Sequence, residues 1–143
     1  MNNEPIWVNY HKHTSLSNRY MKDSPLLPID YWNELKARYG DKSCIYTTVE
    51  HGWAGNYFKQ YDDLEKFNKK NGTNIRWIYG AEAYWVKDRH ESDRSNCHIV
   101  LLARTDKGRK AINKILSIAN KDGYYARPVS YTHLRAHETR GNL

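Results

Sequence analysis

Three stretches of the chain are predicted to form helices. Residues 53–72 carry apolar side chains three or four positions apart, namely Trp53, Tyr57, Tyr61, Leu64 and Phe67. Residues 105–121 repeat this pattern with Ala111, Ile112, Ile115, Leu116 and Ala119. Both patterns predict a helix with one face in the core. Residues 30–40 follow Pro28, a common helix-start residue, and end at Gly40, a common terminator, which predicts a third helix.

Runs of β-branched and aromatic residues lie between these helices and predict strands. They cover residues 5–10, 43–52, 74–86 and 97–104. The last run, CHIVLLAR, is almost continuously apolar, which is typical of a strand buried on both faces. Strands that alternate with helices indicate an α/β protein with parallel strands. In such folds, functional side chains gather at the carboxyl ends of the strands.

The chain is basic, with 23 Lys and Arg against 16 Asp and Glu in 143 residues, a net charge of +7. Such a surface suits an anionic partner such as nucleic acid or a phosphorylated substrate, although a merely solvated surface gives the same balance. Cys44 and Cys97 lack metal-like CxxC spacing and suit a reduced, cytosolic protein. No apolar run reaches the length of a membrane span, and polar residues follow Met1, so we expect a soluble, cytoplasmic protein.

Several histidines stand at the ends of predicted strands. His11 and His13 are one residue apart, and because side chains alternate along an extended chain, their imidazoles should project together. His51 and Glu82 also fall at or just beyond strand ends, whereas His98 stands at the start of its strand. Imidazole nitrogens and carboxylate oxygens are donors that Zn²⁺, Mn²⁺ or Fe accept. A surface or hydrogen-bonded role is the alternative for any one histidine, but the joint pattern favours a metal site.

Four ordered motifs resemble those of the PHP (polymerase and histidinol phosphatase) family. HKHTSLS is similar to the family's HxHxxxS, TTVEHG to TDHG, and YGAEAYW to GxE. CHIVLLARTDKGRKAINKILSIA resembles the HLVLLA strand and helix in the PHP domain of bacterial DNA polymerase III alpha subunits, and DGYYARP is similar to the segment that follows. The match runs from Trp7 to Pro128 in the family's order. GAEAYWV and HIVLLA favour the polymerase branch over the histidinol phosphatase branch.

The resemblance implies the amino-terminal half of a distorted (β/α)7 barrel whose strand ends hold up to three Zn or Mn ions. The metal ligands that it implies are His11, His13, Asp23, His51, Glu82 and His98. Asp23 enters this set as the only carboxylate in the loop after the HxH pair. Glu50 replaces the aspartate of TDHG and could still bond an imidazole N–H. Asn9 stands where many polymerase members have a histidine, and Lys12 is the basic residue expected to meet a substrate phosphate.

The function implied by this resemblance is that of a C-family replicative DNA polymerase. The parent protein would catalyse template-directed nucleotidyl transfer, and its PHP domain could be a metal-dependent 3′–5′ exonuclease. DNA, deoxynucleotides and replisome subunits would be its partners. The alternatives are a free-standing PHP phosphoesterase and a non-catalytic PHP scaffold.

The final residues, 129–143, match nothing in the PHP family. Written back through the genetic code, VSYTHLRAHET resembles a transposon-type sequencing-library adapter read in frame. We therefore expect a partial PHP domain in residues 1–128 and a non-native tail in residues 129–143. On this interpretation the later strands of the barrel are missing, the chain alone has no enzymatic activity, and His133 and His137 have no role.

Overall fold

The computed structural model describes residues 4–17, 23–86, 97–122 and 129–130. These residues form two compact units. The first unit contains the described residues 4–17, 23–48 and 55–79, and the second contains the described residues 49–54, 80–86, 97–122 and 129–130. The architecture is mixed α/β, with a parallel sheet in the first unit and a mixed sheet in the second.

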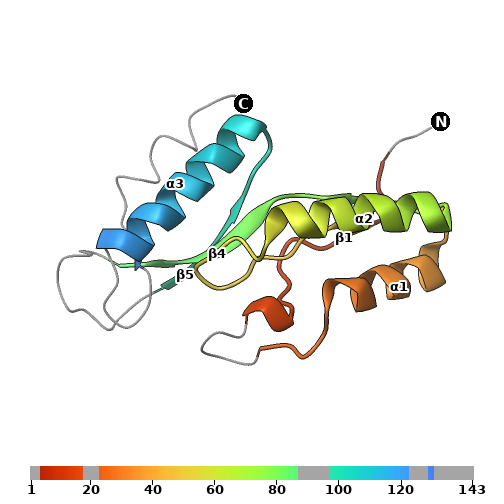
Figure 1. Ribbon diagram of the computed structural model, residues 1–143, viewed down its shortest axis with the longest axis horizontal. Helices are drawn as coiled ribbons and strands as arrows, with labels where there is room; N and C mark the ends of the chain where they lie inside the picture. Colours follow the sequence, from red (N-terminus) through yellow and green to blue (C-terminus); the bar gives the residue numbers. More distant parts are fainter. Residues whose placement is uncertain (1–3, 18–22, 87–96, 123–128, 131–143) are drawn as a thin grey trace. The chain divides into compact units, whose positions relative to one another are not determined.

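The first unit is built on a sheet of three parallel strands. These are β1 (Trp7–Val8), β2 (Ser43–Tyr46) and β3 (Asn74–Trp77), in the order β1-β2-β3. Two helices, α1 (Pro28–Tyr39) and α2 (Tyr57–Asn71), connect the strands and lie side by side (Figure 1). A short 3-10 helix, η1 (Ser15–Ser17), follows β1. The parallel direction of the strands predicted from the sequence is confirmed for this unit.

The core of the first unit is aromatic. Seven buried side chains from the sheet and the two helices form it: Trp32, Leu35, Cys44, Tyr46, Leu64, Phe67 and Ile75. The ring of Trp32 on α1 lies 6.2 Å from Tyr46 on β2 and 5.8 Å from Phe67 on α2. Trp32 therefore links both helices to the sheet. Leu35 lies three residues after Trp32 on α1, and Leu64 lies three residues before Phe67 on α2, so each leucine is on the core side of its helix.

Glycine and a capping carboxylate set the ends of the helices. Asp30 accepts a 2.7 Å hydrogen bond from the Leu27 N–H at the start of α1, and Gly40 ends that helix with a φ of 60°. Gly72 ends α2 as predicted. The start of α2 differs from the prediction, because positive φ angles at Gly52, Gly55 and Asn56 keep the chain from turning into a helix before residue 57.

The predicted buried stripe of this helix is only partly correct. Leu64 and Phe67 are buried, whereas Trp53 and Tyr61 are 40% and 46% exposed. Trp53 precedes the helix and belongs to the second unit. Trp53 is therefore not part of the buried face of α2.

The second unit is built on β4 (Gly80–Trp85), which pairs with β5 (Cys97–Leu102) and with β6 (Val129–Ser130). The helix α3 (Asp106–Asp122) packs against β4 and β5 (Figure 1). Its buried residues are Ile112, Ile115, Leu116 and Ala119, which confirms most of the stripe predicted from the sequence.

Three predictions about these strands are wrong. Residues 74–86 form two strands in different sheets rather than one strand region. β5 runs antiparallel to β4, whereas all strands were expected to be parallel. β5 is also partly exposed, and the strand that is buried along most of its length is β4.

The strand predicted for residues 43–52 ends at Tyr46. From Val49 to Ala54 the chain belongs to the second unit, where His51 forms an isolated parallel bridge with Glu82. Residues 131–143, most of the predicted tail, lie outside the described part of the chain. No helix of the described residues is long and apolar enough to cross a membrane.

Candidate metal centre

The second unit brings Glu82 and His98 together through the pairing of β4 and β5. Tyr84 lies opposite His98 in the antiparallel register, and Glu82 lies two residues before Tyr84 on the same face of β4. The Glu82 Oε1 atom is 2.5 Å from Nδ1 of His98. His98 stands at the start of its strand, and because that strand is antiparallel, its start lies beside the carboxyl half of β4. This pairing explains why His98 did not follow the strand-end pattern of the other candidates.

Backbone hydrogen bonds hold the segment 49–54 against β4 and so place His51 beside Glu82. The Glu82 N–H donates to the Glu50 carbonyl at 3.1 Å, and the Gly52 N–H donates to the Glu82 carbonyl at 2.8 Å. The Nδ1 atom of His51 then lies 3.9 Å from Oε1 of Glu82. Gly52 has a φ of 70°, which L side chains rarely adopt, and its carbonyl accepts a 3.1 Å hydrogen bond from Asn120 on α3.

The two imidazoles pack against each other and against Tyr84. His51 stacks on Tyr84 with ring centroids 5.7 Å apart and an interplanar angle of 13°. The His98 ring packs in a T-shaped arrangement with both rings, with centroid distances of 5.2 Å to His51 and 4.9 Å to Tyr84. Because Tyr84 is buried, this packing restricts the orientation of both imidazoles.

The geometry of His51, Glu82 and His98 suits a divalent cation. One ligand atom from each residue lies within 4.8 Å of the other two. Zinc binds nitrogen and oxygen donors at about 2.0–2.2 Å, so small side-chain rotations would bring all three donors to one ion. The Glu82 side chain is only 2% exposed and that of His51 11%, whereas that of His98 is 40% exposed. A buried carboxylate is stabilised by a bound cation.

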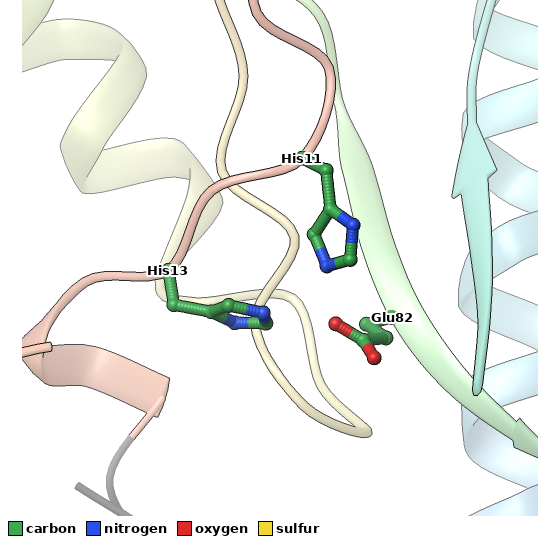
Figure 2. A group of neighbouring side chains, drawn as sticks. All are labelled: His11, His13 and Glu82. Carbon is green, nitrogen blue, oxygen red and sulfur yellow. The ribbon is translucent and has the colours of Figure 1, made fainter. Parts of the chain in front are cut away.

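His11 and His13 lie in the first unit, on the segment that follows β1 (Figure 2). Their ring centroids are 5.3 Å apart, with the rings at 69°, which confirms the prediction that the two imidazoles project together. Nδ1 of His13 is 3.1 Å from the Ser17 hydroxyl, and the Tyr31 hydroxyl donates to the His13 carbonyl at 2.9 Å. These two bonds hold the His13 residue in place, and the His11 side chain is exposed.

The remaining candidates have less defined roles. Asp23 is an exposed residue of the first unit, between η1 and α1. Glu50 is 1% exposed, and its backbone carbonyl accepts the bond from Glu82. The bond from its carboxylate to an imidazole stays a prediction. The Lys12 ammonium lies over the ring of Trp7, at 4.4 Å from its centroid, and burial lowers the pKa of Lys12 to about 8. Its phosphate contact also stays a prediction.

Two residues that position the candidate ligands were not anticipated from the sequence. Tyr84 contacts both His51 and His98, and the alternation of side chains along β4 would have placed it on the face of Glu82. Asn120 carries no such signal. It lies 68 residues from Gly52 along the chain, and only the packing of α3 brings its amide to that carbonyl.

Comparison with known proteins identifies a related sequence but no matching family model. The chain is 30% identical, over 134 aligned residues, to the DNA polymerase III subunit alpha of Aquifex aeolicus (strain VF5). The alignment covers 85% of this chain and 10% of that protein, so the chain spans about a tenth of the length of its curated relative. Most of the chain is therefore similar to one part of a DNA polymerase III alpha subunit.

Proposed function

We propose that residues 1–128 are the amino-terminal part of a PHP domain, and that this domain belongs to a DNA polymerase III alpha subunit. The ordered motifs and the similarity to the Aquifex aeolicus subunit support this assignment. The strands and helices of the two units would then be the first half of the distorted (β/α)7 barrel. Residues 129–143 would be the non-native tail.

The observation that carries the functional proposal is the grouping of His51, Glu82 and His98 in one unit. Two imidazoles and one carboxylate make a three-ligand set of the kind found in catalytic zinc sites, where a further position stays open for water or substrate. We assign these three residues as ligands of a Zn or Mn ion. His11 and His13 are proposed as further ligands from their place in the HxH motif, and Asp23 as the only carboxylate in the loop that follows it.

Such a centre would serve phosphodiester hydrolysis at a DNA 3′ end. A bound divalent ion lowers the pKa of a coordinated water and polarises a phosphoryl oxygen. Glu82 would contribute the negative charge that holds the cation, and His51 and His98, which pack against Tyr84, would each donate a ring nitrogen. Glu50 is buried and directly precedes His51 in the sequence. Its carboxylate would accept a hydrogen bond from an imidazole N–H and so fix the tautomer of that imidazole.

The parent protein would also carry out template-directed nucleotidyl transfer in the cytoplasm, with DNA, deoxynucleotides and replisome subunits as partners. On this proposal, those activities would reside in parts of the protein beyond the segment that this chain matches. For the chain alone we propose metal binding and no nuclease activity.

The metal content of the purified chain tests this proposal. After incubation with zinc and removal of free metal, we expect bound zinc in the wild type and a loss of about one ion in Glu82→Gln. The matched control is Glu34→Gln, which removes an exposed carboxylate on α1 and should leave the zinc content unchanged. Equal zinc in the wild type and Glu82→Gln would contradict the ligand assignment. The same substitution in the complete domain should abolish any 3′–5′ exonuclease.

A further inference from the structure

A separate cavity lies in the first unit, beside β1 and α1. It has a volume of about 200 Å³ and is lined by three aromatic side chains, one leucine, two cations and one carboxylate: Trp7, Tyr31, Tyr39, Leu35, Lys12, Arg38 and Glu34. All of them belong to the first unit, and none is among the proposed metal ligands. The cavity therefore calls for an explanation of its own.

The Lys12 ammonium is the unusual group in this cavity. Its Nζ lies 4.5 Å from the ring centroid of Tyr31 and 5.3 Å from that of Tyr46, in addition to its contact with Trp7. These cation–π contacts replace part of the water that the half-buried ammonium has lost. Within the described part of the chain, Lys12 forms no ion pair with a carboxylate.

Among the described residues, Glu34 is the only carboxylate that lines the cavity, and it is already paired with a cation. Glu34 lies 2.5 Å from Nε of Arg38, four residues later on α1. Two cations and one carboxylate leave the cavity with a net positive charge, which an anion would balance. The Arg38 side chain is largely exposed and retains N–H groups for a second partner at the rim.

The aromatic side chains that line the cavity indicate that the anionic ligand also carries a flat ring. The rings of Trp7 and Tyr39 lie 6.5 Å apart at an interplanar angle of 33°, and such surfaces accept the flat face of a nucleobase. The volume is below the range of about 300–1,000 Å³ typical of complete small-molecule sites. A ligand of nucleotide size would therefore fill the cavity with its ring and keep its phosphate at the rim.

We propose that this cavity binds one nucleotide, with its base against Trp7 and Tyr39 and its phosphate at Lys12 and Arg38. The positive charge of the cavity favours the phosphate of this ligand, and the aromatic walls favour its base. A free mononucleotide and the end of a single DNA strand present the same chemistry. Charge-assisted hydrogen bonds to phosphate would supply most of the selectivity.

Calorimetric titration of the whole chain with deoxyadenosine monophosphate, in buffer containing a chelator, tests the proposal. We expect saturable binding that Lys12→Met weakens about ten- to hundredfold, the range expected for loss of a hydrogen bond from a charged group. Methionine keeps the unbranched apolar stem against the rings. Arg38→Gln, a substitution on the exposed face of α1, should weaken binding less, by about three- to tenfold. The matched control Lys42→Met changes an exposed lysine outside the cavity and should bind as the wild type does.

Titration with further ligands distinguishes a free nucleotide from the end of a DNA strand. Binding of a short oligodeoxyadenylate about tenfold tighter than the mononucleotide would assign the cavity to a strand end, and equal or weaker binding would assign it to a free nucleotide. Unchanged affinity in both Lys12→Met and Arg38→Gln, equal binding of deoxyadenosine, or no saturation up to about 10 mM would overturn the proposal. Glu82→Gln should leave nucleotide binding intact, so that failure of the metal assignment and failure of this one are distinguishable.

Discussion

The close approach of three elements at Gly80 provides a sharp test of how the candidate metal centre is built. A Cβ atom at this position would lie 2.8 Å from Cδ2 of Leu102, 2.8 Å from Cγ1 of Val49 and 2.9 Å from the Leu101 carbonyl oxygen. Carbon atoms in ordinary contact are about 3.5–4.0 Å apart, so the methyl group of Gly80→Ala would be at least about 0.7 Å too close to two side chains. Those side chains can shift, but the carbonyl belongs to the ladder between β4 and β5.

We expect Gly80→Ala to lower the free energy of unfolding by about 1–3 kcal/mol, the usual cost of overpacking. Because Val49 is two residues before His51, its displacement should also move the imidazole and weaken zinc binding by about tenfold. Urea unfolding and zinc titration measure the two effects.

Gly108→Ala is the matched control, since its Cβ would meet neighbouring atoms at ordinary distances of 3.6–3.7 Å at the start of α3. It should raise the free energy of unfolding by about 0.5–1 kcal/mol. The reasoning is refuted if Gly80→Ala matches the wild type in both stability and zinc affinity.

Three further predictions concern positioning and charge. Tyr84→Leu removes the ring that packs on both imidazoles and should weaken zinc binding by about tenfold. Tyr84→Phe keeps the ring and should keep most of the zinc affinity. Equal zinc affinity in Tyr84→Leu and the wild type would argue against a positioning role for Tyr84. Asn120→Ala removes the bond to the Gly52 carbonyl and should lower the free energy of unfolding by about 1 kcal/mol in urea, and an unchanged midpoint would show that this bond does not hold the segment. Burial lowers the pKa of Lys12 from 10.5 to about 8, so the unfolded chain binds more protons than the folded chain between these pH values. The contribution of Lys12 therefore makes the wild type gain stability relative to Lys12→Met as the pH rises from 8 to 10.5, and a parallel pH dependence of the two proteins would contradict it.

The helices could be predicted well because their signals are local. Gly40 and Gly72 end α1 and α2, and the buried residues of α3 follow its apolar spacing. The start of α2 could not be predicted, because the backbone angles of Gly52, Gly55 and Asn56 depend on contacts made by the segment before the helix.

Strand direction was the main error, and part of the reason lies in the sequence. Parallel neighbours need a connection of about a dozen residues or more, usually a helix. The stretch 87–96 between β4 and β5 is shorter and highly charged, with no helical pattern. It therefore already favoured the antiparallel pairing that brings His98 to Glu82.

The candidate ligands could be proposed from the sequence because metal donors are chemically distinctive, and because most of them stand near the ends of predicted strands. Their surroundings could not be found in this way. Tyr84 resembles any core aromatic residue until the positions of the rings of His51 and His98 are known. Asn120 acquires its role only when α3 packs on the sheet.

Anomalous diffraction at the zinc edge from crystals of the zinc-loaded chain tests the metal assignment most directly. We predict a strong peak about 2.0–2.2 Å from a ring nitrogen of His51, a ring nitrogen of His98 and a carboxylate oxygen of Glu82. A zinc-loaded crystal with no peak between these three side chains would contradict the account.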